Sequence, residues 1–358
     1  MRRIKLAVLA TLIAGGIAVY ASRNAIAERL YLRALDQSVG VDQSRTLGDG
    51  LHAYLCGSGS PLADAERAGP CVAIIAGNDA FVFDSGSGST RKLLRMGFPI
   101  ERMRGVFLTH LHSDHIDGLG ELLMQTWVGG SRSVPIPVYG PPGTERVLAG
   151  LREAYTLDAG YRVGHHGSEF ARPGGFGGTP QILTIVEGPP GTAPVYDQGG
   201  VKITVIRVDH APIAPAYGYR IDYKGRSIAL SGDTVYSPGF VAASKGADVM
   251  FHEALNPRMV RQLQAKLAQR GRDDAAKITG DIPGYHASPA DAARAAEAAG
   301  VKALVLYHLV PSIPAGPMEG LFLGNAASRF DGKLVVGRDG LLVSLPANGK
   351  DIRFDQGL

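Results

Sequence analysis

Four side chains that commonly bind metals stand within six residues of this chain, directly after an apolar run. The segment Phe107–Leu119 reads FLTHLHSDHIDGL and contains His110, His112, Asp114 and His115. In an extended chain, residues two apart point the same way, so His110 and His112 are expected to face one metal ion. Asp114 and His115 follow once the chain turns, and we expect them to face a second ion. The motif predicts a metal-binding turn at the end of a strand, because a polar surface loop would not need this density of ligands.

Further candidate ligands stand just past the ends of other apolar runs. These are His210 after ITVIRVD, Asp233 after IALSG, His252 after DVMF and His308 after LVLY. Open α/β sheets place their chemistry at strand ends, so these residues are expected to converge. Taken singly, His210 and His308 would fit core or loop positions, and Asp233 would fit a turn or a helix cap. With the opening motif, His210 is expected to complete the first site and His308 the second, and the Asp233 carboxylate to bridge both.

The predicted ligands are imidazoles and carboxylates without a thiolate. This donor set suits Zn²⁺, with Mn²⁺ or Fe as alternatives. Two metals about 3.5–4 Å apart can share a hydroxide that acts as the nucleophile, and can stabilise charge on the attacked centre. The sequence therefore predicts two Zn²⁺ ions and a hydrolytic reaction in which Asp114 takes part as ligand and partner of the hydroxide.

The rest of the chain alternates strand and helix patterns, which predicts an α/β fold with antiparallel strands early and strand–helix alternation later. The prolines of VPIPVYG (134–140) predict an edge strand, and Thr144 is expected to cap the next helix. Asn256 and Ser288 are expected to cap later helices. The stretch DGKLVVGRDGLLVSL (331–345) is expected to form a hairpin.

The N-terminus reads MRRIKLAVLATLIAGGIAVYAS, a basic start followed by a mostly apolar run. Residues 1–27 are predicted to be a signal peptide, with an uncleaved signal anchor as the alternative. Residues 28–47 are expected to form a linker and 48–358 a hydrolase domain. Export places the protein in the periplasm, or anchored to a membrane and facing the periplasm, so a membrane contact is expected only through this segment.

Cys56 and Cys71 stand 15 positions apart, at the ends of a loop rich in Gly and Pro. In an oxidising compartment a disulfide is expected, although two unrelated free thiols remain the alternative. The net charge of +4 and the pI near 9.0 come without a block of like charges, so a nucleic-acid partner is not expected. A homodimer is compatible with the sequence.

At this point the residues resemble the metallo-β-lactamase superfamily. THLHSDHIDGL is similar to its H-x-H-x-D-H signature, and His210, SGDT with Asp233, and LYHL with His308 follow in the order of its other metal motifs. The resemblance spans about residues 48–345. It implies a four-layer αββα sandwich with a di-zinc site, and a supporting role for Asp84 in FVFDSGSGS.

Within the superfamily, the chain resembles the ribonuclease Z and arylsulfatase-like branch. FHEALNP is similar to the His-Glu-Ala-Thr motif of that branch, with Leu255 in place of threonine, and YHASP approximates its His-Ser-Thr stretch. The resemblance implies that His286 donates a proton to the leaving oxygen and that Glu253 orients it. A histidine near metals is suited to general acid catalysis on physical grounds as well.

One departure bears on the substrate. Ribonuclease Z enzymes carry a long arm for tRNA between the His and Asp metal motifs, but His210 and Asp233 are only 23 positions apart here. We therefore expect a small-molecule ester, either a phosphodiester or a sulfate ester, in place of tRNA. The alternatives are a lactonase or β-lactamase-type hydrolase, which would use much the same ligands, and a non-catalytic metal-binding module.

Overall fold

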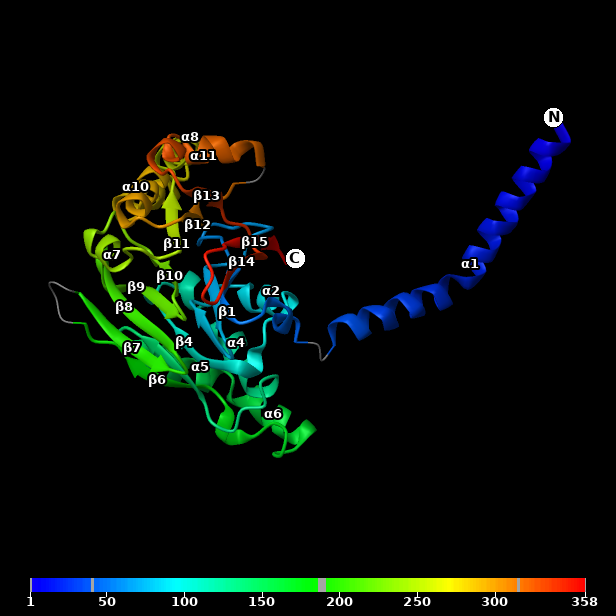
Figure 1. Cartoon of the computed structure of the whole chain (residues 1–358), viewed down its shortest axis with the longest axis horizontal. Coiled ribbons are helices and arrows are strands. Elements are labelled where there is room, and N and C mark those ends of the chain that lie inside the picture. The colour runs from blue at the N-terminus through cyan, green and yellow to red at the C-terminus, as the bar shows by residue number, and fades with distance from the viewer. Residues whose placement is uncertain (1, 40–41, 186–190, 314–315, 358) are drawn as a thin grey trace. The chain divides into compact units, whose positions relative to one another are not determined.

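The computed structural model describes residues 2–39, 42–185, 191–313 and 316–357, and separates into two compact units, Met1–Gln43 and Ser44–Leu358. The first unit is one helix, α1 (Arg2–Ser38), coloured blue in Figure 1. Its stretch Ala7–Gln37 is long and apolar enough to cross a membrane, and none of its most apolar part is buried. The helix runs through residues 28–38, for which we expected a linker.

The second unit contains two mixed sheets. Among the described residues, the first sheet has eight strands, antiparallel from β15 to β3 and parallel from β3 to β6. In spatial order they are β15 (Arg353–Gln356), β14 (Leu341–Pro346), β1 (Gly50–Gly57), β2 (Cys71–Ala76), β3 (Asp79–Phe83), β4 (Met103–Phe107), β5 (Ile136–Gly140) and β6 (Gly178–Ile182).

The second sheet has seven strands among the described residues, parallel from β13 to β10 and antiparallel from β10 to β7. In spatial order they are β13 (Lys333–Val336), β12 (Ala303–Val310), β11 (Val249–Leu255), β10 (Arg226–Leu230), β9 (Ile213–Tyr223), β8 (Val201–His210) and β7 (Thr192–Gln198).

Helices cover the outer face of each sheet. The main helices are α2 (Ser89–Arg95), α3 (Ser113–Ile116), α4 (Leu119–Val128), α5 (Thr144–Ala154), α6 (Thr156–His166), α7 (Pro238–Ala243), α8 (Pro257–Gln269), α9 (Asp273–Asp281), α10 (Pro289–Ala299) and α11 (Glu319–Leu323). Short 3₁₀ turns occupy Gln43–Leu47, Ile100–Arg102, Pro173–Gly175, Ile282–Gly284, Gly316–Met318 and Ala326–Arg329. Figure 1 shows α7 and α10 flanking the second sheet.

Three apolar cores follow from this layering. The central core lies between the sheets and joins β1 and β2 residues such as Leu51 and Ile74 to β8 and β9 residues such as Val205 and Tyr219. A second core packs the first sheet under α2, α4 and α5, and a third packs the second sheet under α7, α10 and α11. Every residue of β1 is buried, as expected of a strand covered on both faces. The predicted αββα sandwich is confirmed.

Several expected local structures are confirmed. Asn256 caps α8 by accepting from the Met259 N–H, and Ser288 forms a capping box with Asp291 at the start of α10. Gly300 ends α10 in the left-handed conformation that glycine adopts at low cost. These signals are local, so the sequence carries them without knowledge of the tertiary structure.

Three local predictions were wrong. The expected hairpin at 331–345 is instead β13 in the second sheet followed by β14 in the first. The expected edge strand, β5, lies between β4 and β6, and Pro137 is tolerated because pairing with β4 begins at Val138. The residue capping α5 is Gly143, while the Thr144 hydroxyl donates to the Pro141 carbonyl.

Candidate metal centre

The H-x-H-x-D-H motif crosses from the end of β4 into α3. His112 is extended (φ −63°, ψ 148°) and helical geometry begins at Ser113, so the chain turns between the two histidines and the Asp114–His115 pair. The turn packs tightly against a neighbouring loop: a Cβ on Gly86 would lie 2.4 Å from the Asp114 carbonyl oxygen. Only glycine permits this approach, which explains the Gly-rich stretch after β3.

The structure gathers the first predicted ligand group. His110, His112, His210 and Asp233 offer ligand atoms that all lie within 4.8 Å of one another. His110 Nε2 lies 2.8 Å from His112 Nδ1, and His210 Nε2 lies 3.4 Å from the same Nδ1. Three imidazole nitrogens facing one point are what a metal ion needs, and they make poor hydrogen-bond partners for each other.

The second predicted group lies beside the first. Asp114, His115 and His308 also offer atoms within 4.8 Å of one another. Asp114 Oδ2 lies 3.2 Å from His308 Nε2 and 3.5 Å from His115 Nε2. His308 has a positive φ of 46°, a conformation that costs energy for a residue with a side chain and is typical of functional sites.

Asp233 stands between the two groups, as predicted for a bridging carboxylate. Its Oδ2 lies 3.3–3.9 Å from a ring nitrogen of each of four histidines, namely His308, His115, His110 and His210. Its Oδ1 has no hydrogen-bond partner among the described residues, although the side chain is buried. Burial would raise the pKa of Asp233, but the His308 and His115 charges hold it well below its usual range.

Asp84 supports the centre in the way that the resemblance implied. Its two oxygens accept hydrogen bonds from the Thr109 N–H and the Thr109 hydroxyl, each at 2.8 Å. Its Oδ2 also lies 2.8 Å from His115 Nδ1, which turns His115 Nε2 toward Asp233. A carboxylate behind a histidine in this way fixes the tautomer and strengthens the imidazole as a ligand.

His286 and Glu253 form a buried pair next to both groups. Glu253 Oε1 lies 2.9 Å from His286 Nδ1 and accepts from the Ala287 and Thr234 N–H groups. The His286 ring is stacked on the His308 ring with 5.5 Å between centroids. Burial lowers the pKa of His286, but the Glu253 charge and hydrogen bond outweigh it and raise that pKa to about 9. Glu253 therefore fixes the orientation of the His286 ring through Nδ1.

The structure separates one predicted candidate from the rest. His252 precedes Glu253 on β11, so its side chain points to the opposite face, where its ring packs edge-on against Phe240 under α7. It belongs to none of the candidate metal groups found among the described residues. Strand alternation could have excluded it, because His252 and Glu253 cannot both face the site.

Two contributions were missed by sequence reasoning. The Tyr285 carbonyl accepts from His210 Nδ1 at 2.9 Å, and the Thr109 hydroxyl links Asp84 to the motif. The first leaves no signal in the sequence, because any residue has a carbonyl. The second is visible in hindsight as the threonine of THLH.

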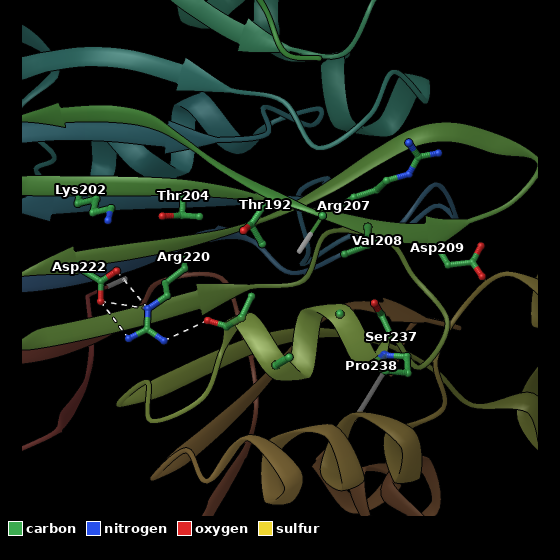
Figure 2. Close-up of a pocket in the computed structure, with 14 residues that line it drawn as sticks. Thr192, Lys202, Thr204, Arg207, Val208, Asp209, Arg220, Asp222, Ser237 and Pro238 are labelled. Carbon is green, nitrogen blue, oxygen red and sulfur yellow. Dashed lines mark hydrogen bonds and ion pairs between the residues drawn. The ribbon is translucent and has the colours of Figure 1, made fainter. Parts of the chain in front are cut away.

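A cavity of about 240 Å³ opens onto both groups. Its lining includes His112, Asp114, Asp233, His286 and His308, and the rest is mostly apolar apart from Ser113 and Tyr285. A larger cavity of about 910 Å³ lies on the second sheet beside α7, and none of the candidate ligands lines it (Figure 2). There Arg220 is paired with Asp222 at 3.0 Å, which offsets its charge. Of these two cavities, the smaller is the one that candidate metal ligands line.

The residues present fit divalent metal ions. Asp233 Oδ1, His115 Nε2 and His308 Nδ1 are buried without a hydrogen-bond partner among the described residues, an arrangement that costs free energy unless something else binds them. Imidazole nitrogens and carboxylate oxygens are the donors that Zn²⁺, Mn²⁺ and Fe accept. All seven predicted ligands lie together, although their roles as ligands stay predictions.

Comparison with known proteins agrees with this centre. The family model described as a beta-lactamase superfamily domain matches residues 80–309. A protein named ribonuclease Z from Mycobacterium bovis (strain BCG / Pasteur 1173P2) is 36% identical over 291 residues, which is 81% of this chain and 96% of that protein.

Solved structures share the fold. The metallo-β-lactamase fold protein YhfI from Bacillus subtilis superposes with a TM-score of 0.59 at 19% identity, covering 83% of this chain and 100% of that one. The short form of human tRNase Z gives a TM-score of 0.58 at 20% identity, covering 82% of this chain and 99% of the other. With its matching domain, fold and histidine–aspartate centre, this chain belongs to the metallo-β-lactamase superfamily and is a metal-dependent hydrolase.

Proposed function

We propose that the protein is a di-zinc hydrolase that cleaves a phosphodiester or sulfate ester of a small molecule. The observation that carries the proposal is the position of Asp233 Oδ2, which lies 3.3–3.9 Å from ring nitrogens of both ligand groups, beside a cavity that His286 also lines. A site with one metal ion would leave the side chains of one ligand group without an ion to bind. Zinc is the ion best suited to this donor set, with Mn²⁺ and Fe as alternatives.

The chain's own residues account for orientation and proton transfer. Bound metal ions would supply the charge that acidifies water and stabilises negative charge on the attacked centre. The ester oxygen that leaves needs a proton. His286 lines the cavity and is placed to donate one. Glu253 fixes the His286 tautomer through the 2.9 Å contact to Nδ1, so Nε2 is the nitrogen free to point at the substrate.

Cavity size and topology support a small substrate over tRNA. A volume of about 240 Å³ suits one compact ester group. The segment between His210 and Asp233 is occupied by β9 and β10, which lie inside the second sheet, so no arm extends from this part of the chain. The relative named ribonuclease Z supports phosphodiester chemistry.

The same proposal includes export. The exposed apolar helix α1 and the disulfide between Cys56 and Cys71 both support an oxidising location, either periplasmic or anchored to a membrane and facing the periplasm. Such a location would keep the enzyme away from tRNA. Small molecules would then be its partners.

Metal content and turnover test the function together. Purified protein should contain two equivalents of zinc per chain and hydrolyse at least one of a phosphodiester, an aryl sulfate and a lactone, all chromogenic. Turnover of the lactone alone would favour the alternative function, a lactonase. Stoichiometric zinc with no turnover of any ester would overturn the proposed function in favour of a binding module.

A further inference from the structure

The cavity beside the metal centre has an apolar wall built from three separate segments. Pro61 and Leu62 come from the loop between β1 and β2, Ile278 and Ile282 from α9 and the turn after it, and Val310 from the end of β12. Leu62 and Ile282 pack against a small core of Leu255, Val260 and Val310. The wall is therefore continuous with a small apolar core, which holds Leu62 and Ile282 in place.

The wall carries no group that would hold a second anion. Among the described residues that line the cavity, none is Lys or Arg, and the polar residues other than Ser113 and Tyr285 belong to the metal centre or to His286. Nucleic-acid sites rely on such cations to hold successive phosphates. The site is thus suited to one charged ester centre attached to an uncharged apolar group.

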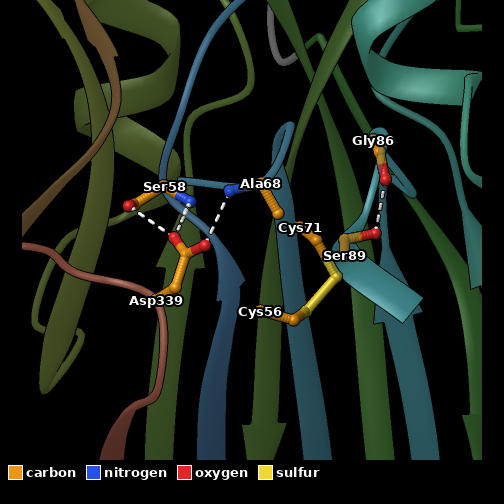
Figure 3. Close-up of a disulfide and its surroundings, with 7 residues drawn as sticks. All are labelled: Cys56, Ser58, Ala68, Cys71, Gly86, Ser89 and Asp339. Carbon is orange, nitrogen blue, oxygen red and sulfur yellow. Dashed lines mark hydrogen bonds between the residues drawn. A yellow bond between two sulfur atoms is a disulfide. The ribbon is translucent and has the colours of Figure 1, made fainter. Parts of the chain in front are cut away.

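The loop that carries Leu62 is held in place at several points. We call residues 57–70 the disulfide loop, because the Cys56–Cys71 disulfide closes its base (Figure 3). Asp339 accepts hydrogen bonds from the Ser58 N–H at 2.8 Å and from the Ala68 N–H at 2.6 Å, so one buried carboxylate joins both arms of the loop. The tip is fixed by Asp64, which accepts from the Ser312 hydroxyl.

The part of the apolar wall that α9 contributes includes a large, exposed apolar side chain. Ile278 lies on α9 with 64% of its surface exposed, although isoleucine is usually buried. Neighbouring Lys277 pairs with Asp281 on the same helix, so its charge is offset there. Because Ile278 lines the cavity, its exposed side chain offers an apolar surface to a bound ligand.

We propose that the apolar wall binds the leaving group, and that this group is a compact uncharged moiety such as an aryl ring. This inference rests on the proposed function. The leaving side is chosen because Ile282 and Tyr285 lie on the same short segment as His286, the proposed proton donor. Leu62 and Ile278 are the residues that set this selectivity.

The reaction then balances as a simple hydrolysis. The oxygen of water forms a bond to phosphorus or sulfur, and the bond from that atom to the ester oxygen breaks. The ester oxygen leaves with the electron pair and takes a proton from His286. The proton lost by the attacking water restores His286, so no other reactant is needed.

The test compares two methyl phosphodiesters whose leaving groups match in acidity but differ in shape. One leaving group is a phenol and the other a short fluorinated alcohol. We expect kcat/KM to be about 10-fold higher for the aryl ester, because a well-filled apolar pocket discriminates by about this much. In Ile278→Ser and Leu62→Ser the preference should fall to about twofold or less, chiefly because KM for the aryl ester rises.

Val134→Ser is the matched control, because Val134 is also an exposed apolar residue, at 62%, and does not line the cavity. Equal rates for the two esters in the wild type would overturn the inference, as would equal losses on both esters in the variants. Ile278 is exposed, so its substitution leaves the core intact even if Leu62→Ser unfolds the protein.

A binding measurement separates this inference from the proposed function. If neither ester turns over, the proposed function fails, but the wall can still be tested with phenylphosphonate and methylphosphonate by calorimetry on the zinc-loaded full chain. The inference requires phenylphosphonate to bind about 10-fold more tightly, and Ile278→Ser to remove that advantage. Equal dissociation constants would reject the apolar wall as a binding site.

Discussion

Asp233 shows how one carboxylate can organise a whole centre. It is buried among four imidazoles, and a carboxylate in such a place is stabilised by positive charge. Burial lowers the pKa of His110 well below its usual range, whereas the charges of Asp233 and Asp84 outweigh burial at His115 and raise its pKa. Histidines so close together cannot all be protonated, so metal ions are the natural source of the missing charge.

Removal of Asp114 tests the second ligand group. Asp114→Ala should retain the fold, because this side chain faces the cavity, and should lower kcat/KM by more than about 100-fold. Zinc stoichiometry, measured by mass spectrometry on the dialysed protein, should fall below two. Asp117→Ala is the control, since Asp117 is an exposed carboxylate three residues away that lies in neither ligand group. Wild-type activity in Asp114→Ala would contradict the mechanism.

His286 gives a pH-dependent prediction. Its protonated form is the proposed acid, and its pKa is raised to about 9, so activity should be present below this pKa and lost as pH rises through it. Bound dications would repel the imidazolium, so this alkaline loss of activity (the alkaline limb of the pH profile) would occur at a lower pH. His286→Ala should remove the limb and slow poor leaving groups about 100-fold more than good ones. Equal slowing of both, measured across pH 6–10 (roughly the titration range of His and Tyr), would exclude His286 as the donor.

The ligand set was largely predictable because it is written as motifs. His110, His112, Asp114 and His115 are adjacent in sequence, and the distant ligands each follow a recognisable strand. The apolar wall was not predictable, because Leu62, Ile278 and Val310 meet only through the tertiary fold. Tyr285 contributes its carbonyl, which no residue pattern encodes.

At the level of elements, the disulfide loop has both a structural and a functional consequence. Replacing both cysteines, as Cys56→Ser with Cys71→Ser, opens a loop whose ends are 15 positions apart and should lower the free energy of unfolding by about 3 kcal/mol. Urea denaturation would measure the loss. KM for an aryl ester should rise severalfold while zinc stoichiometry stays constant, because the loop carries the apolar wall and none of the predicted ligands. Unchanged stability would mean that the hydrogen bonds of the loop, including those of Asp339 and Asp64, hold it without the disulfide.

The helix α10 gives an independent element-scale prediction. Its capping box begins at Ser288, two residues after His286, so loss of the cap should loosen the segment that positions the proton donor. Ser288→Ala should cost about 1 kcal/mol in thermal or urea unfolding. Ser328→Ala, at an exposed turn, should change stability by less than about 0.5 kcal/mol. A cost at Ser288 no greater than at Ser328 would refute the structural role of the cap.

The prediction of a hairpin at residues 331–345 was wrong for a reason that is general to this fold. The sequence from Lys333 to Leu345 has two strands and a Gly-containing turn, which locally favour pairing. In the structure Gly337 carries the chain from the second sheet toward the first, where a Cβ would lie 2.6 Å from Leu55 Cδ2. Strand partners are chosen by the two-sheet packing, and a local pattern cannot report that choice. The prolines of VPIPVYG misled for the same reason: Pro135 precedes β5, and Pro137 precedes the first residue that pairs with β4, so neither marks an edge.

At the scale of the whole molecule, the two units differ in what stabilises them. All three large cores, as far as the described residues show, are built from residues after Thr46, so the unit Ser44–Leu358 has what it needs to fold alone. The helix α1 exposes large apolar side chains such as Leu12 and Ile17, at 68% and 63%. The exposed apolar surface of α1 is what the proposed export or membrane anchoring would cover.

Deletion of residues 2–43 therefore separates folding from location. The shortened protein should keep its melting temperature within about 2 °C and its kcat/KM within about twofold, because the metal centre and cores lie in the second unit. The full chain should be degraded when protease is added to intact spheroplasts, whereas the shortened protein should be protected inside them. Protection of the full chain would contradict export, and would return a cytoplasmic nucleic-acid substrate to consideration. If the full chain is protected, Cys56 and Cys71 should also be reduced, because they stay paired only where the compartment is oxidising.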